Sequence, residues 1–369
     1  MVAGRPRAHM SFSSTLFRTA TGFPGQVDSA TCELGWASRA SPKRLPHGVD
    51  WNRPIRRGSF LPAQLRGRRT VLGVTGYQWA DLPAAVRAQV ETFCGSIREV
   101  TAVPAGLTAG IAVRLDTERG PLFLKALPAD SSSAVLYQRE RHVNAALPAE
   151  VPTPRLRWSG QNAGWLTLLF DHVTAHHTAD LGPPSPDVVA LLDVVALLGE
   201  RLTPTPGADV PPLADNVAFL VRRADALLAA PPPDLESLAQ YRSARRGLEV
   251  DALTGTSLLH ADLHEGNLLA GTDHLHVIDW GLACQGPAWA EVALLIPRLI
   301  AAGHTPAEAE ALAARLPVWK VAPETAVTGL AAVWSLFREF VARNGPQRIR
   351  ASRARAADAG RAWVEHRTR

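Results

Sequence analysis

The chain has 369 residues, of which 46% are hydrophobic and 20% charged, and its formal net charge is +5. This composition is that of an ordinary globular protein, and it excludes collagen-like, disulfide-framework and wholly disordered chains. No run reaches the roughly 18 uninterrupted apolar residues that a spanning helix needs, so we expect no membrane partner.

The charge is distributed unevenly along the chain. Residues 1–70 hold 12 Lys and Arg against 3 acidic residues, and residues 347–369 hold 7 Arg against 2 acidic residues, so the body between them is net acidic. A basic segment indicates nucleic-acid binding only where the charge lies on a folded face. Because both segments read as tails, we expect no specific nucleic-acid partner.

Three cysteines, Cys32, Cys94 and Cys284, form no CxxC pair. They predict neither a disulfide framework nor a zinc site, and a reducing cytoplasm fits them best. The first thirty residues are rich in Arg and Ser, as in an organellar transit peptide. A flexible leader or an over-long predicted start explains the same composition.

The expected elements begin after a disordered basic leader over residues 1–70, which shows no period of 2 or 3.6. Asp81 can cap a helix that places Leu82, Val86, Val90 and Phe93 on one face. The N-terminal lobe, residues 71–170, then contains strands over 111–116 and 122–127 joined by a hairpin turn, a helix over 133–147, and strands over 155–158 and 165–170.

Long helices dominate the second lobe, residues 171–346. One starts at the cap Ser185-Pro186-Asp187, and another starts at a capping box, Thr305-Pro306-Ala307-Glu308. A third carries Leu330, Trp334, Phe337 and Val341 on one face, and residues 347–369 follow as a basic C-terminal tail. We therefore expect an α+β fold with a small β-rich lobe and a larger helical lobe.

The chemistry-bearing segment lies between two apolar runs. It reads Leu258-Leu259-His260-Ala261-Asp262-Leu263-His264-Glu265-Gly266-Asn267-Leu268-Leu269, and Val277-Ile278-Asp279-Trp280-Gly281 follows. Phosphoryl transfer needs a carboxylate to orient an attacking hydroxyl and oxygen ligands to hold Mg²⁺ on nucleotide phosphates. Asp262, Asn267 and Asp279 supply such oxygens. His264 is expected to be a loop or surface residue rather than a ligand.

These two blocks resemble the catalytic loop and the metal-binding motif of the protein-kinase-like fold. The His-Ala-Asp-Leu-His-x-Gly-Asn version followed by Asp-Trp-Gly is similar to the aminoglycoside phosphotransferase and choline-kinase-like branch. The resemblance implies that Asp262 is the catalytic base, that His260 supports the catalytic loop, and that Asn267 and Asp279 bind Mg²⁺. It implies ATP, or GTP, as the phosphoryl donor.

The resemblance also implies a nucleotide-binding half. Lys125, in an apolar strand, would pair with Glu140 and bind the α- and β-phosphates. Alternatively, Lys125 reaches solvent from an edge strand and Glu140 lies on a surface helix. The segment with Gly106, Thr108 and Gly110 would offer backbone N–H groups to phosphate oxygens, although it lacks the first glycine of the kinase pattern.

We therefore expect a phosphotransferase that moves the γ-phosphate of ATP to a hydroxyl of a small molecule. The acidic body favours a cationic acceptor such as an aminoglycoside, held by carboxylates at Asp171, Asp180, Glu265 and Glu291. Glu291 either supports the catalytic loop or faces the substrate, or it is merely an acid in the first turn of a helix. The alternatives are a catalytically idle kinase-like binding module and a kinase of a neutral metabolite or amino alcohol. The sequence does not determine the oligomeric state.

Overall fold

The structure is a computed structural model that describes residues 70–71, 74–75, 77–103, 110–271 and 274–369. The leader predicted for residues 1–70 lies outside the described residues except for Thr70. Gly106 and Thr108 also lie outside them.

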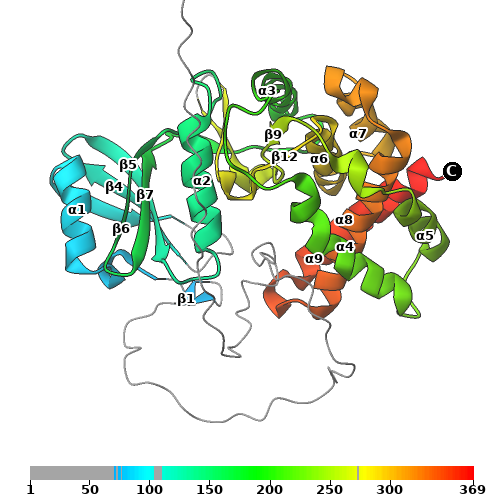
Figure 1. The fold of residues 1–369 in the computed structure, drawn as a ribbon, viewed down its shortest axis with the longest axis horizontal. Helices are drawn as coiled ribbons and strands as arrows, with labels where there is room; N and C mark the ends of the chain where they lie inside the picture. Colours follow the sequence, from blue (N-terminus) through cyan, green and yellow to red (C-terminus); the bar gives the residue numbers. More distant parts are fainter. Residues whose placement is uncertain (1–69, 72–73, 76, 104–109, 272–273) are drawn as a thin grey trace, which may run out of the picture.

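The first lobe is built on a five-stranded antiparallel sheet with the strand order β3-β4-β5-β7-β6 (Figure 1). The expected hairpin is present, and Thr117 pairs with Gly120 at its turn. The strands of the sheet are β3 (Ile97–Ala102), β4 (Ile111–Thr117), β5 (Gly120–Pro128), β6 (Leu156–Asn162) and β7 (Trp165–Asp171). A separate two-stranded pair precedes it, β1 (Thr70–Val71) with β2 (Val74–Thr75).

One helix covers each face of this sheet. Helix α1 (Ala84–Cys94) buries Val86 and Val90 against one face, and helix α2 (Ala134–Ala146) packs on the other. Side chains alternate along a strand. In β5, Leu124 and Ala126 therefore belong to the α1 side, whereas Phe123 and Leu127 belong to the α2 side.

The start of α1 differs from the prediction that Asp81 caps it. Pro83 occupies the N-cap position of α1, and Asp81 ends a short 3₁₀ turn, η1 (Trp79–Asp81). The Asp81 carboxylate accepts a hydrogen bond from the Gln78 backbone N–H at 2.7 Å. The predicted apolar face is nevertheless present, because Leu82 is buried beside Val86 and Val90.

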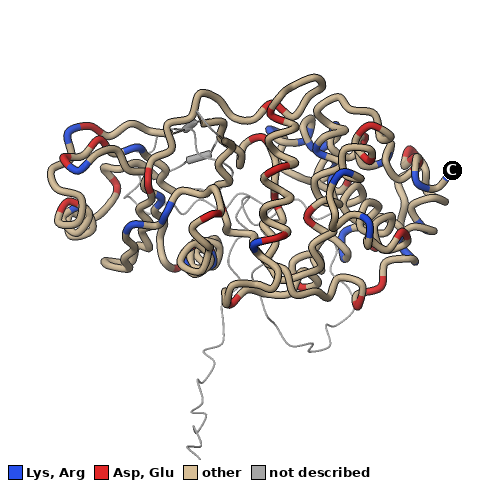
Figure 2. The backbone as a smooth tube through the Cα atoms, turned by 90° about the horizontal axis from the view of Figure 1, so that it is seen from above, with Lys and Arg blue, Asp and Glu red and all other residues tan. Residues whose placement is uncertain are grey.

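Basic and acidic residues are interspersed over both lobes, as Figure 2 shows from above. Many of them pair locally; Arg245 binds Asp225, and Arg343 binds Asp234 and Glu339. The net acidic charge of the body is therefore spread over the described surface.

Short strands and turns form the part of the second lobe that faces the sheet. The hairpin of β10 and β11 also pairs with β8, and β9 pairs with β12. The strands are β8 (His177–Thr178), β9 (Ser257–Leu259), β10 (Leu268–Ala270), β11 (Leu275–Val277) and β12 (Cys284–Gly286). The 3₁₀ turns are η2 (Val250–Leu253), η3 (Glu265–Asn267), η4 (Trp280–Leu282) and η5 (Pro317–Val321).

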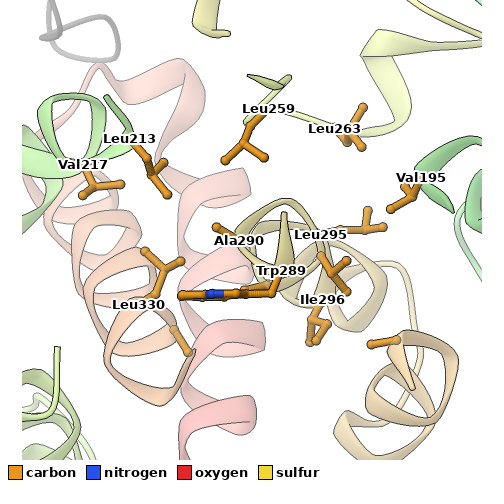
Figure 3. Packing of buried hydrophobic residues seen from close by; sticks show 14 of the residues in the cluster. Val195, Leu213, Val217, Leu259, Leu263, Trp289, Ala290, Leu295, Ile296 and Leu330 are labelled. Atoms are coloured by element: carbon orange, nitrogen blue, oxygen red, sulfur yellow. The ribbon is translucent and has the colours of Figure 1, made fainter. Parts of the chain in front are cut away.

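The rest of the second lobe is helical, as expected. Around α6, the apolar side chains Trp289, Leu295 and Ile296 pack with residues of neighbouring elements, including Leu213 and Leu330 (Figure 3). The predicted capping box of α7 is present, since Thr305 and Glu308 bond each other's backbone N–H groups. The helices are α3 (Asp187–Arg201), α4 (Leu213–Ala229), α5 (Leu238–Arg246), α6 (Trp289–Ala301), α7 (Pro306–Ala313), α8 (Glu324–Asn344) and α9 (Gln347–Arg367).

The prediction of a basic tail over residues 347–369 is wrong. Residues 347–367 form α9, which packs along α8 and against α6, and Trp363 and Val364 are completely buried. Arg367 binds Glu310 and Glu324. The many arginines of this segment obscured its apolar positions in the sequence, although Arg367 in fact pairs with carboxylates of two neighbouring helices.

Helix α2 also contacts the second lobe. The buried Arg139 donates hydrogen bonds to Asn216 Oδ1 and to the Ala283 carbonyl, each at 3.3 Å. Among the described residues, no helix combines the length and apolar character needed to cross a membrane.

Candidate active site

Lys125 lies at the centre of a charged cluster between the two lobes. It alternates with Leu124 and Ala126, so its side chain is on the α2 side of the sheet. The Lys125 ammonium is 2.7 Å from Glu140 Oε2 on α2 and 3.2 Å from Asp279 Oδ1. The edge-strand interpretation of Lys125 is wrong, because β5 is the central strand of the sheet.

Burial and charge act in opposite directions on this cluster. Burial alone would lower the pKa of Lys125, but the carboxylates of Asp279 and Glu140 raise it above its usual value, so the ammonium stays charged. Burial raises the pKa of Glu140, although Lys125 opposes that shift. Glu140 also accepts a hydrogen bond from the Trp280 backbone N–H, which follows Asp279 directly. The predicted pair therefore also holds the Asp279 segment.

His260 supports the catalytic loop from inside the protein. Its side chain is fully buried, Nε2 donates a hydrogen bond to the Ile278 carbonyl at 2.9 Å, and Nδ1 accepts one from the Asp262 backbone N–H at 3.3 Å. Burial lowers the pKa of His260 and keeps the imidazole neutral. His260 thus connects the residue before Asp279 to Asp262, as the resemblance implies.

Glu291 holds the same loop from the first turn of α6. Its carboxylate accepts hydrogen bonds from the backbone N–H groups of His260, at 2.5 Å, and Ala261, at 3.1 Å. Ala261 has a φ of 63°, and Asp279 has a φ of 65°. Such left-handed backbone conformations cost about 1–3 kcal/mol each in non-glycine residues and cluster at functional sites. The buried Glu291 is thus a support of the loop, the first of the expected alternatives.

Asp262 lies beside an arginine and a histidine. Its Oδ1 is 2.8 Å from Nη2 of Arg298 on α6, and its Oδ2 is 3.6 Å from Nε2 of His264. Burial would raise the pKa of Asp262, but the neighbouring His264 side chain and the Arg298 charge hold it well below its usual range. The carboxylate is therefore ionised at neutral pH.

Asn267 and Asp279 come from the two sides of the β10–β11 hairpin. Leu268 pairs with Val277, and the Ile278 backbone N–H donates to the Asn267 carbonyl at 3.0 Å. The Asn267 side-chain amide donates to the Asp262 carbonyl at 3.0 Å, which leaves its Oδ1 as an available acceptor. The Asp279 side chain is 52% exposed. The fold thus brings the two predicted metal ligands together.

Gly110 is the described residue of the predicted phosphate loop. A Cβ there would lie 2.7 Å from the Tyr137 hydroxyl oxygen and 2.9 Å from the Ala126 carbonyl oxygen, so the close packing itself requires glycine. Tyr137 in turn lies against the Lys125 ammonium, 5.0 Å from its ring centre. The packing explains this glycine without a nucleotide.

Two neighbours of Asp262 were not predicted from the sequence. His264 is a loop residue, as expected, but its position beside Asp262 was not predicted, and its side chain is half-buried there. Arg298 was not considered. Its signal is an arginine that lies seven residues after Glu291 in an otherwise apolar helix, a spacing that places both side chains on the same helix face.

Comparison with known proteins agrees with this geometry. The chain belongs to the phosphotransferase enzyme family (APH), whose model matches residues 99–325. A search of curated proteins finds no significant match. The expected family and the expected enzyme class, a small-molecule kinase, are therefore confirmed.

Solved structures share the fold at low sequence identity. A thermostable mutant of aminoglycoside phosphotransferase APH(4)-Ia, in complex with ADP and hygromycin B, is 18% identical with a TM-score of 0.52, covering 76% of this chain and 99% of that chain. Choline kinase LicA from Streptococcus pneumoniae is 14% identical with a TM-score of 0.53, covering 75% and 98%. These similarities confirm the expected two-lobed kinase-like fold.

Proposed function

We propose that this protein transfers the γ-phosphate of ATP to a hydroxyl group of a small molecule. The observation that carries the proposal is the convergence of five side chains from distant segments: Lys125, Glu140, Asp262, Asn267 and Asp279. A direct chain of contacts joins them, from Glu140 through Lys125 to Asp279, and through the backbone pairing of the β10–β11 hairpin to Asn267 and Asp262.

Lys125 would bind the nucleotide phosphates. Its ammonium is charged and is oriented by Glu140, so part of the cost of ordering a lysine side chain is met before the ligand arrives. The backbone that follows β7 would contact the base. The crystal structure of APH(4)-Ia in complex with ADP supports the nucleotide assignment. We propose ATP as the donor, with GTP as the alternative.

Mg²⁺ fits the pair of Asn267 and Asp279. One amide oxygen and one exposed carboxylate are hard oxygen ligands, and Mg²⁺ commonly takes one or two protein oxygens together with phosphate oxygens and water. When bound there, the ion would neutralise charge on the transferred phosphate.

Asp262 would orient the acceptor hydroxyl. Because its carboxylate is ionised, it accepts a hydrogen bond from the hydroxyl and receives the proton as the hydroxyl oxygen forms its bond to the γ-phosphorus. The bond between the γ-phosphorus and the β–γ bridging oxygen breaks, and its electron pair leaves with the nucleoside diphosphate. His260 and Glu291 touch no reacting atom in this scheme, and we propose that they position the loop.

The test is Mg²⁺-dependent binding of ATP, measured by isothermal titration calorimetry, followed by transfer of labelled γ-phosphate to a library of hydroxyl compounds. Lys125→Met should weaken ATP binding at least tenfold. The matched control is Lys320→Met, since Lys320 is exposed on η5 and lies outside the cluster. Equal ATP affinity in the two variants would contradict the phosphate-binding role of Lys125.

The same experiment separates the alternatives. ATP binding without transfer to any hydroxyl compound would favour a kinase-like binding module.

We place the reaction in a reducing cytoplasm because both described cysteines, Cys94 and Cys284, are free and buried.

A further inference from the structure

The backbone of Asp262 is fixed on both sides. Its N–H group donates to Nδ1 of His260 at 3.3 Å, and its carbonyl oxygen accepts a hydrogen bond from the side-chain amide of Asn267 at 3.0 Å. Glu291 holds the N–H groups of the two preceding residues. None of these contacts reaches the carboxylate of Asp262, so they leave its side-chain torsion angles open. The direction of the carboxylate therefore depends on contacts of its own.

Arg298 makes a short contact with that carboxylate. Its Nη2 donates to Oδ1 of Asp262 at 2.8 Å, a length typical of a charge-assisted hydrogen bond between a guanidinium and a carboxylate. Nε2 of His264 lies 3.6 Å from Oδ2, which is beyond the usual length of a hydrogen bond. The two oxygens of Asp262 are therefore in different situations: Oδ1 is bound by a directional hydrogen bond, and Oδ2 lies at a longer distance from its neighbour.

The guanidinium of Arg298 is itself held in place. Trp334 on α8 is buried, and its ring centre lies 5.4 Å from Cζ of Arg298, within the range of a cation–π contact. The Arg298 side chain is only 15% exposed. A planar guanidinium that lies over an indole ring has few orientations open to it, so the directions of its N–H bonds are set before any ligand binds. Trp334 thus supports the contact between Arg298 and Asp262.

Helix α6 carries the support of the loop and the support of the carboxylate. Glu291 lies in its first turn and binds the loop backbone, and Arg298, seven residues later on the same helix face, binds the Asp262 side chain. One rigid helix therefore fixes both the position of the loop and the direction of the side chain that it carries. An error of about 1 Å at reacting groups can cost on the order of 100-fold in rate, so this second contact matters for the reaction.

We propose that Arg298 is a positioning residue of the phosphotransfer reaction, which binds Oδ1 of Asp262 and thereby turns Oδ2 toward the acceptor hydroxyl. This inference rests on the proposed phosphotransferase function and adds a residue to it. Oδ2 accepts the hydroxyl proton as the hydroxyl oxygen bonds to the γ-phosphorus, and the nucleoside diphosphate leaves with the electron pair of the broken bond. Arg298 touches no reacting atom and acts through Asp262. The competing interpretation is that Arg298 only neutralises a buried carboxylate, which requires a positive charge but no particular direction.

The experiment measures transfer of labelled γ-phosphate from saturating Mg²⁺·ATP to two probes. One probe is water, followed as released inorganic phosphate, and the other is the hydroxyl compound that reacts fastest in the library. Arg298→Ala should lower kcat on the order of 100-fold with both probes. The KM for the hydroxyl compound and the affinity for Mg²⁺·ATP should stay within about threefold, because Arg298 contacts neither of them in this scheme. Arg298→Lys keeps the charge but not the planar fork of donors, so it should recover only part of the lost kcat.

Two further measurements separate direction from charge. Guanidinium ion added to Arg298→Ala should raise kcat several-fold, whereas methylammonium at the same concentration should not, because it lacks the planar fork of donors. The double variant Asp262→Asn/Arg298→Ala should be no slower than Asp262→Asn alone, since the two residues act through one group. The double variant also removes both charges of the pair, so it leaves no buried carboxylate unpaired and remains informative where Arg298→Ala alone does not fold.

The control is Arg245→Ala, because Arg245 forms an ion pair with Asp225 at 2.8 Å in the same lobe and should leave kcat unchanged when it is removed. Three results would each overturn the positioning role and leave the phosphotransferase function intact: a wild-type kcat in folded Arg298→Ala, full activity in Arg298→Lys, or a double variant slower than Asp262→Asn. Equal rescue by guanidinium and methylammonium would also overturn it, in favour of charge alone. Binding of Mg²⁺·ATP by the wild type without transfer to water or to any hydroxyl compound would contradict the proposed function itself, and the role of Arg298 with it.

Discussion

Replacing Glu291 should loosen the catalytic loop and the fold together. In Glu291→Ala, the N–H groups of His260 and Ala261 lose their acceptor inside the protein. A buried donor left without a partner costs about 1–3 kcal/mol, so two of them predict a loss of about 4 kcal/mol, reduced where water enters the space. Glu291→Gln keeps one oxygen acceptor and should lose about half as much.

Activity should fall further than stability alone explains. A displacement of about 1 Å at the reacting groups can cost on the order of 100-fold in rate, and Asp262 follows directly after the two residues that Glu291 holds. We therefore expect kcat to fall about 100-fold in Glu291→Ala at temperatures where the variant is still folded. ATP affinity should change little, because Lys125 and Glu140 do not touch Glu291.

The assay is thermal unfolding together with steady-state kinetics, and the exposed Glu249→Gln serves as the control.

Burial raises the pKa of Glu291 to about 7 from an ordinary 4.5, although the loop N–H groups oppose the shift. The folded state therefore binds this proton more tightly than the unfolded chain does, and the part of the stability that comes from the bound proton is lost as the pH rises from about 4.5 to about 7. Because Gln does not titrate, the difference in free energy of unfolding between wild type and Glu291→Gln should become smaller as the pH rises over that range. A melting temperature and kcat within error of wild type in Glu291→Ala would refute the reasoning.

Three further predictions concern other parts of the molecule. Asp262→Asn should lower kcat by 10²–10⁴-fold, while the ATP affinity measured by calorimetry stays within about twofold. Asp193→Asn on α3 is the control. Wild-type turnover in Asp262→Asn would exclude Asp262 as the group that orients the hydroxyl. Lys125→Met leaves the buried Glu140 without its cation and should lower the free energy of unfolding in urea by about 3 kcal/mol. The double variant Lys125→Met/Glu140→Gln should recover most of that loss. Additive losses in the two single variants would show that the pair is not coupled. Trp363→Ala should lower the free energy of unfolding by about 3–5 kcal/mol, because this side chain is completely buried and its indole N–H donates to Glu310 at 2.7 Å. The control is the exposed Arg355→Gln, which should leave the stability measured by calorimetry unchanged. An unchanged stability in Trp363→Ala would mean that α9 does not contribute to the core.

The candidate site residues that could be predicted from the sequence are those that lie in short motifs of defined spacing. Asp262, Asn267 and Asp279 stand in two short blocks, and the loops that carry them are set by local strands and turns. The pairing of Lys125 with Glu140 was implied by the family resemblance, and the cost of an unpaired charge in an apolar strand agrees with it.

Contacts between helices that are far apart in the chain could not be predicted from the sequence. Arg298 reaches Asp262 across 36 positions, and Arg338 meets Arg298 only because α6 and α8 cross beside Trp334. The misassignment of residues 347–369 has a related origin. Arginine dominates that segment, and only the packed fold shows that Trp363 and Val364 point inward while the guanidinium groups reach the carboxylates around them.

Helix α2 belongs to both lobes, and this has a consequence for how the molecule unfolds. One of its residues, Glu140, holds Lys125 of the sheet, and the residue before it, Arg139, is buried against Asn216 and Ala283 of the helical lobe. Separating the lobes would take Asn216 and Ala283 away from Arg139, and it would take Asp279 and the Trp280 N–H group away from the Lys125–Glu140 pair. The two lobes therefore form one cooperative unit, and a defect in either of them reaches the other through adjacent residues of a single helix.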